Sequence, residues 1–256
     1  MSQNIPAIEY LIIGATMTSF AMQLTSHTSV EVPFSEIYLH DYEVSKFTSL
    51  LESSSNGITD GDRAKECFER SSGIVLIKTF REIEAKYTDY LSVLAKKKIV
   101  SVGPLVQDPI HEYEKREIIE WLNNKEPSSA VFVSFVSEYF LSKEEIQEMA
   151  YGLENSMMSF IWVVRFPQAM PMQLDQPPNA RPVEELGVGV EVKRDMDGKL
   201  EREEVAKVIR EVVVEKIGEG VRIKAKELKE KIRNKGDEEI DGVVQLVQIC
   251  SKKNRH

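Results

Sequence analysis

Cysteine and histidine are scarce in this chain of 256 residues, which has two cysteines and four histidines. Cys67 and Cys250 make neither a disulfide framework nor a Cys-x-x-Cys metal site. The histidines are His27, His40, His111 and His256. None has a histidine four residues away or a cysteine nearby, as the common metal motifs require. We therefore expect reduced thiols in the cytoplasm, surface histidines and no metal site.

Positive charge is also in deficit, because 33 lysines and arginines face 42 aspartates and glutamates and the net charge is -9. This balance argues against a nucleic-acid partner and against an anionic membrane surface. The most apolar stretch, residues 10–22, is interrupted by glycine, threonine and serine and is shorter than the ~20 residues that a membrane span needs. No basic leader precedes it, so we expect neither a membrane span nor a secretory signal.

Glycine patterns of the common nucleotide and hydrolase sites are absent as well. The sequence has no Gly-x-Gly-x-x-Gly, no P-loop and no Gly-x-Ser-x-Gly. What it does have is ordinary material for a globular core, with 42% hydrophobic and 29% charged residues. At this length the chain can form one large domain or two small ones.

The stretch 128–176 organises the chain. Residues 130–136 and 160–164 are short apolar runs rich in valine and phenylalanine, typical of strands that are buried on both faces. Residues 141–153 between them have an apolar stripe at helical spacing, and Ser142 and Glu145 form a capping-box pair. Strand, helix and strand with short connections predict a right-handed βαβ unit of a parallel sheet.

Ligands of parallel sheets gather at the carboxyl ends of the strands, and Ser137 follows the first of these strands. Its hydroxyl and amide could serve a phosphate, although an ordinary loop serine is the alternative. Asp175 and Gln176 place a carboxylate and an amide side by side, a pair that can bind two adjacent sugar hydroxyls. The alternative for Asp-Gln-Pro-Pro is a simple turn.

The remaining chain predicts further strands and helices on both sides of this unit. We expect strands at 5–13, 73–77, 99–102 and 188–192, helices at 14–24, 63–70, 82–94, 117–122, 179–186, 205–212 and 221–235, and a loop at 50–62. The polar segment after residue 106 marks a domain boundary. We therefore predict domains at 1–106 and 107–250 and a disordered tail at 251–256.

Two segments, VFVSFVSEYF at 131–140 and PMQLDQ at 171–176, closely resemble plant UDP-sugar-dependent glycosyltransferases of family 1, in the branch that extends glycosides. The resemblance covers nearly the whole chain. It implies an α/β fold of two Rossmann-like domains (GT-B), with the acceptor on the N-terminal domain and the UDP-sugar on the C-terminal one. It implies donor-binding roles for Ser137 at the diphosphate and for Asp175 and Gln176 at the sugar. The partners would be a UDP-sugar, as substrate rather than cofactor, and a small-molecule acceptor.

Three departures from the family pattern accompany this resemblance. The family's catalytic histidine and its aspartate lie upstream of the segment matched by residues 4–7, so we assign no catalytic residue here. In the family a donor block that ends in Asp-Gln supplies a tryptophan stacked on uracil and hydrogen bonds to the ribose and the diphosphate. Most of this block is missing where Gln168 follows Pro167, which would remove about two strands from the C-terminal sheet. Val136 stands where the family has glycine, and a β-branched side chain there would crowd a phosphate.

Two functions therefore stay open. The first is an enzyme that transfers a hexose from a UDP-sugar to a hydroxyl of a plant small molecule or glycoside, impaired in this chain. The second is a non-catalytic, truncated or pseudogene-like product that acts at most as a weak binding module. Missing strands would leave apolar edges and faces uncovered, so we also expect poor solubility or self-association. A rearranged, smaller sheet with residues 168–171 beside 160–164 is the alternative fold.

Overall fold

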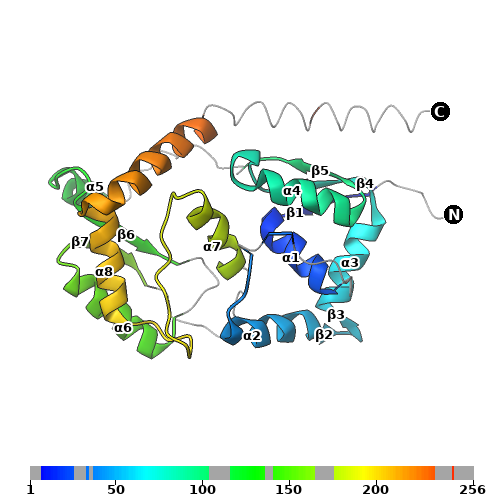
Figure 1. Ribbon diagram of the computed structural model, residues 1–256, viewed down its shortest axis with the longest axis horizontal. Coiled ribbons are helices and arrows are strands. Elements are labelled where there is room, and N and C mark those ends of the chain that lie inside the picture. The colour runs from blue at the N-terminus through cyan, green and yellow to red at the C-terminus, as the bar shows by residue number, and fades with distance from the viewer. Residues whose placement is uncertain are drawn as a thin grey trace. The chain divides into compact units, whose positions relative to one another are not determined.

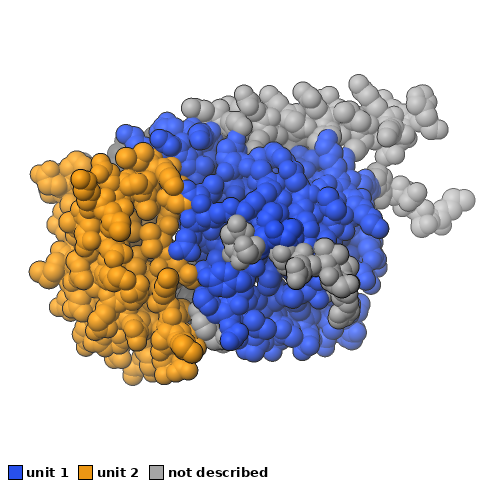
Figure 2. All heavy atoms as spheres, in the orientation of Figure 1, with its two compact units in different colours: residues 1–106, 174–186, 225–256 blue, residues 107–173, 187–224 orange. Residues whose placement is uncertain are grey.

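The computed structural model describes residues 7–25, 33–34, 37–103, 116–135, 141–164, 176–233 and 244. Contacts divide the chain into two units, which Figure 2 colours separately. Unit 1 comprises Met1–Val106, Leu174–Leu186 and Ala225–His256, and unit 2 comprises Gln107–Gln173 and Gly187–Lys224. The predicted folding domains, 1–106 and 107–250 with a tail at 251–256, stay a prediction.

Unit 1 is built on a parallel sheet of three strands in the order β1-β4-β5 (Figure 1). The strands are β1 (Ala7–Leu11), β4 (Ser71–Ile77) and β5 (Lys98–Ser101). Leu11 pairs with Ile77 and Ile77 with Ser101, so the three strands end at the same edge of the sheet. This edge is the place where a ligand of unit 1 would bind.

The helices of unit 1 are α1 (Ala15–Thr25), α2 (Asp41–Glu52), α3 (Asp60–Arg70), α4 (Arg81–Ala95) and α7 (Gln176–Glu185). The segment 50–62, predicted as a loop, instead contains the end of α2, the hairpin of β2 (Ser54–Ser55) and β3 (Ile58–Thr59), and the start of α3. Asn56 and Gly57 turn this hairpin with φ of 57° and 76°, as a two-residue turn with positive φ requires. The Asn-Gly pair was the signal that the loop interpretation missed.

The core of unit 1 lies between the sheet and these helices. Tyr87 and Leu91 of α4, Phe47 of α2, and Val75 and Ile77 of β4 are almost completely buried. The rings of Phe20 and Phe47 tilt against each other with centroids 5.7 Å apart. The apolar stripe that predicted α4 therefore faces the core.

Unit 2 contains the predicted βαβ unit. Its elements are α5 (Arg116–Asn123), β6 (Ala130–Ser134), α6 (Lys143–Asn155), β7 (Ser159–Val163), α8 (Arg202–Val213), the 3-10 turn Lys216–Gly218, and the first part of a helix at 219–233. β6 and β7 pair in parallel, with Val133 opposite Trp162. The predicted capping box is present, because Glu145 N donates to Ser142 Oγ at 3.1 Å and Ser142 N donates to Glu145 Oε2 at 2.8 Å.

Helices α6 and α8 form the core of unit 2 with the inner face of the two strands. Leu153 and Val205 are buried, with Val133 and Trp162 packed around them. A Cβ on Gly152 would lie 2.6 Å from the Val205 side chain, so only glycine allows α8 this close. The core of unit 2 therefore depends on direct contact between the two helices.

The predicted strand at 188–192 is wrong, because the structure assigns no strand there. Alternation of apolar and polar residues is typical of a strand with one face in solvent. A strand also needs a neighbouring strand to pair with, and none of the described strands pairs with this segment. Val192 still packs against the core of unit 2. The alternative strand at 168–171 lies outside the described residues. No helix in the described part of the chain is long and apolar enough to cross a membrane.

Helix α4 offers a matched pair of substitutions, since Leu91 is fully buried and Val93 is 73% exposed. We expect Leu91→Ala to lower the free energy of unfolding of unit 1 by ~2–5 kcal/mol, because it leaves a cavity in the core. Val93→Ala should change it by less than ~0.5 kcal/mol. Urea unfolding followed by circular dichroism measures both, and similar losses in the two variants would contradict this packing.

Candidate functional site

The predicted donor residues fall largely outside the described structure. Ser137 and Asp175 lie outside the described residues, as does Val136. Gln176 is the first residue of α7, where only its backbone is described. The roles assigned to Ser137, Asp175 and Gln176 therefore stay predictions, and the surroundings of α7 and α6 carry the structural argument.

The first turn of α7 is poor in hydrogen-bond donors. Pro177 and Pro178 follow Gln176, and proline has no N–H to offer an anion at a helix start. Their fixed φ suits the first turn of a helix and stabilises it. The same two residues remove two backbone N–H groups from that turn. This terminus therefore fits a neutral ligand such as a sugar hydroxyl better than a phosphate.

Glu185 and Arg181 attach α7 to the rest of unit 1. Glu185 pairs with the ammonium of Lys86 and accepts a hydrogen bond from Tyr87 Oη at 2.7 Å. Burial alone would raise the pKa of Glu185, but these bonds outweigh it and the pKa is lowered. The guanidinium of the buried Arg181 lies over the ring of Tyr38, 4.3 Å from its centroid. The backbone that begins at Gln176 is thus fixed from its C-terminal side.

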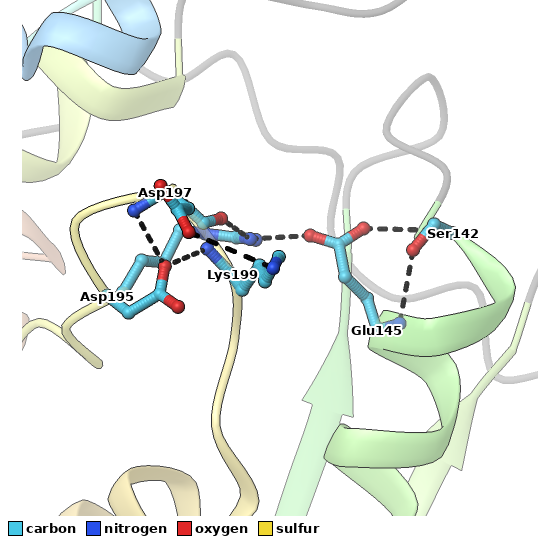
Figure 3. Close-up of polar contacts among 7 residues, drawn as sticks. Ser142, Glu145, Asp195, Asp197 and Lys199 are labelled. Carbon is cyan, nitrogen blue, oxygen red and sulfur yellow. Dashed lines mark hydrogen bonds and ion pairs between the residues drawn. The ribbon is translucent and has the colours of Figure 1, made fainter.

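In unit 2 the start of α6 is closed by its own side chains (Figure 3). Glu145 accepts from Ser142 N on one side and pairs with Arg194 on the other. Burial alone would raise its pKa, but the bonds from the Ser142 backbone and from Arg194, together with the charge of Arg194, lower it. The carboxylate thus occupies a place at the helix start where an external anion would otherwise be favoured.

The loop beside Glu145 is an ordered turn. Asp195 Oδ1 accepts from Asp197 N at 2.9 Å and from Lys199 N at 2.7 Å, and Arg194 donates to Gly198 O at 2.9 Å (Figure 3). Asp195 is therefore engaged with its own backbone. Among the residues that the structure describes, no group of three or more histidines, cysteines or carboxylates is placed to hold a metal ion.

Unit 1 contains a polar cluster that the sequence did not reveal, centred on the buried Glu84. Its Oε1 accepts from Thr16 N at 2.9 Å and from Thr16 Oγ1 at 2.6 Å, while Oε2 accepts from Ala15 N at 3.0 Å and from Thr79 Oγ1. The backbone of Glu84 leaves the helical region, with φ -127° and ψ 29°, and α4 is kinked there. Its partners in α1 are 68 and 69 residues away, so no local spacing could predict the cluster.

His40 is the one histidine within the described residues. Its ring packs edge-on against Tyr38, with centroids 5.2 Å apart, and its backbone N donates to Glu43 Oε2 at 2.8 Å. It stands immediately before α2, and its carbonyl oxygen accepts from Glu43 N at 2.8 Å and from Val44 N at 3.1 Å. His27, His111 and His256 lie outside the described residues.

Sequence relatives decide the family. Mogroside IIIx synthase from Siraitia grosvenorii is 40% identical over 98% of this chain and 70% of its own length. UDP-glucosyltransferase 29 from Panax ginseng is 40% identical with the same two coverages. This chain belongs to the plant UDP-glycosyltransferases. The family recognised from 131–140 and 171–176 is thereby confirmed, although no protein-family model matches the chain.

The glycosyltransferase fold is also confirmed by solved structures. A structure of Phytolacca americana UGT2 with UDP-2-fluoro-glucose and pterostilbene matches 98% of this chain and 72% of its own, with a TM-score of 0.71 at 18% identity. Os79 from O. sativa in complex with UDP matches 93% of this chain and 72% of its own, with a TM-score of 0.68 at 19% identity. The α/β fold with Rossmann-like parts is therefore correct.

The alignment with a UDP-glycosyltransferase relative reveals positions with no counterpart in this chain. The match to mogroside IIIx synthase runs over 323 positions, although this chain has only 256 residues. The relative therefore carries residues inside the matched span that are absent here. This agrees with the gap in the donor block that the resemblance implied.

The lowered pKa of Glu145 predicts a dependence of stability on pH. Because the ionised carboxylate favours the folded state, its contribution is complete above the ordinary pKa of 4.5 and is lost as pH falls through the lower folded value. We expect Glu145→Gln to destabilise unit 2 at neutral pH and to reduce the loss of stability on acidification below 4.5.

Urea unfolding at a series of pH values tests this expectation. Glu154→Gln, which changes an exposed glutamate of the same helix, is the control and should keep the wild-type pH dependence. If the free energy of unfolding of Glu145→Gln fell on acidification as steeply as that of wild type, the role assigned to the Glu145–Arg194 pair would be contradicted.

Proposed function

We propose that this chain is a hexosyltransferase by descent, acting on a UDP-sugar and a hydroxyl of a plant small molecule or glycoside, and that sugar transfer is impaired in it. The acceptor class is supported by relatives whose names refer to glycosides. Among them is cyanidin-3-O-glucoside 2-O-glucuronosyltransferase from Bellis perennis, 35% identical over 98% of this chain. The donor class is supported by solved neighbours that hold UDP or UDP-2-fluoro-glucose. We further propose a cytoplasmic location and no cofactor beyond the UDP-sugar substrate.

The reaction of such an enzyme is a single displacement. The acceptor oxygen attacks the anomeric carbon, the bond from that carbon to the diphosphate breaks, and UDP leaves as the acceptor proton passes to a base. In this chain we propose Ser137 for the diphosphate and Asp175 with Gln176 for the sugar hydroxyls. We assign no residue of this chain to the base.

The impairment follows from what the incomplete donor block would remove. A base stacked on an aromatic ring contributes ~1–3 kcal/mol, and each hydrogen bond to an anionic ligand ~1.5–3 kcal/mol. Loss of one stack and several such bonds removes ~5 kcal/mol or more, which corresponds to at least a thousandfold in affinity at about tenfold per 1.4 kcal/mol. The observation behind this proposal is the alignment with mogroside IIIx synthase, in which the relative has positions without a counterpart in this chain.

Calorimetry with UDP and UDP-glucose tests the donor site. We expect affinities at least about a thousandfold weaker than those of the Panax ginseng relative measured in parallel. Radiolabelled UDP-glucose with glycoside acceptors should give no turnover above background. Ordinary tight binding of UDP, or turnover that Asp175→Ala abolishes, would contradict the impairment.

A second function, a non-catalytic interaction module, is favoured by one surface of unit 2. On the outer face of β6 and β7, Phe132 is 68% exposed, and Val163, two residues beyond its partner Ile161, is 37% exposed. Helix α5 likewise exposes Ile118, Ile119 and Leu122. The family resemblance implies that about two strands of this sheet are missing here, which would leave its apolar side chains uncovered. We therefore propose that a second copy of the chain covers this face.

Light scattering coupled to size exclusion tests this second function. We expect wild type to form dimers or larger species and Phe132→Ser to shift them toward monomer, since a polar group weakens apolar burial. Met196→Ser is the control, because Met196 is an exposed apolar side chain on the loop of unit 2. A monomeric wild type with one sharp thermal transition would exclude self-association.

A further inference from the structure

The carboxyl edge of the sheet in unit 1 is where an α/β fold usually binds a phosphate. Helix α1 begins at Ala15, a few residues after β1 ends at Leu11. In such a fold the backbone N–H groups at the start of the first helix point at the ligand, and the helix dipole favours negative charge. Here that position is occupied by a carboxylate from the same chain.

Glu84 fills this position completely. Each of its oxygens accepts one backbone N–H from the start of α1 and one threonine hydroxyl, from Thr16 or Thr79. Glu84 is 5% exposed, and both threonines are buried. The four donors therefore face an acceptor-only group inside the protein, as an ionised carboxylate requires.

The approach of the chain to this carboxylate leaves no room for a second anion. A Cβ on Gly14 would lie 2.8 Å from Oε1 and 2.9 Å from Oε2 of Glu84. Such distances are shorter than side-chain carbons tolerate, so even a methyl group is excluded. A phosphate could reach the Ala15 and Thr16 amides only by displacing Glu84.

We propose that Glu84 is a built-in anion that closes the helix start of unit 1 to phosphate-bearing ligands and so restricts this edge of the sheet to uncharged ones. Glu84 excludes phosphate by occupying the amides and hydroxyls that a phosphate would need, and it does so without contacting the ligand that binds. This inference goes beyond the proposed sugar transfer and holds whether or not the chain turns over a substrate.

The surface around the closed terminus agrees with an uncharged ligand. Ile12 and Ile13, between β1 and α1, are 73% and 41% exposed, so the surface next to this helix start is apolar. Lys78, just after β4, is exposed, and its charge is present equally in wild type and in every Glu84 variant. The wild-type protein therefore measures the contribution of Lys78 in any test of anion binding.

Chemical rescue tests the proposal in the full chain. Glu84→Ala removes the two carbons and two oxygens that acetate carries, so acetate should refill the site. We expect Glu84→Ala to have a lower Tm than wild type. Acetate should raise the Tm of Glu84→Ala by about 2–4 °C relative to chloride at equal ionic strength. Inorganic phosphate should raise it as well, because the vacated amides and hydroxyls would accept an anion.

Two controls accompany this variant. Wild type should show neither increase, because its site is filled. Asp89→Ala, which removes a carboxylate of α4 paired with Arg81 on the surface, should also show neither. Failure of acetate or of phosphate to stabilise a folded Glu84→Ala overturns the proposal.

Glu84→Gln decides the question if Glu84→Ala does not fold. The amide has nearly the same shape, but its NH₂ faces donors where the carboxylate accepted two bonds. We expect a lower Tm than wild type and no rescue by acetate, because the site remains filled. A Glu84→Gln protein as stable as wild type would show that the negative charge is not required and would overturn the proposal.

Discussion

Backbone amides at the start of a helix must find acceptors, and in this protein the same chain supplies them at five helices. Glu84 serves α1, Glu43 serves the residue before α2, and Thr59 caps α3. Ser142 and Glu145 close α6, and Glu148 accepts from the backbone of Arg202 at α8. Each such bond stabilises its helix and at the same time removes a place where a phosphate could bind. The side chains that stabilise the helix starts are therefore the same ones that occupy amides to which an anion could bind.

Local patterns explain why part of this arrangement could be predicted from the sequence. The strands of β6 and β7, the stripe of α6 and the Ser142–Glu145 box depend on residues a few positions apart, and the structure confirms them. The segment 188–192 has an equally clear alternation but forms no strand, because pairing depends on a distant neighbour. The Asn-Gly pair at 56–57 is likewise a local signal of a hairpin turn, although the polar residues around it favour a loop.

The polar contacts that shape the candidate sites could not be predicted in this way. Arg194 is 49 residues from Glu145, and Arg202 is 54 residues from Glu148. Such partners meet only after the helices have packed, so no spacing rule signals them. Family resemblance supplied the donor residues instead, and relatives confirm the family, while the roles of Ser137, Asp175 and Gln176 stay predictions.

The four bonds of Glu84 also bear on how unit 1 assembles. Moving a carboxylate out of water costs much free energy unless protein donors replace the hydrogen bonds that water made to its oxygens. Its donors come from the start of α1 and from Thr79, which follows β4, while the carboxylate itself belongs to α4. Docking of α1 and closure of the first turn of α4 are therefore expected to occur together, as one cooperative event in folding.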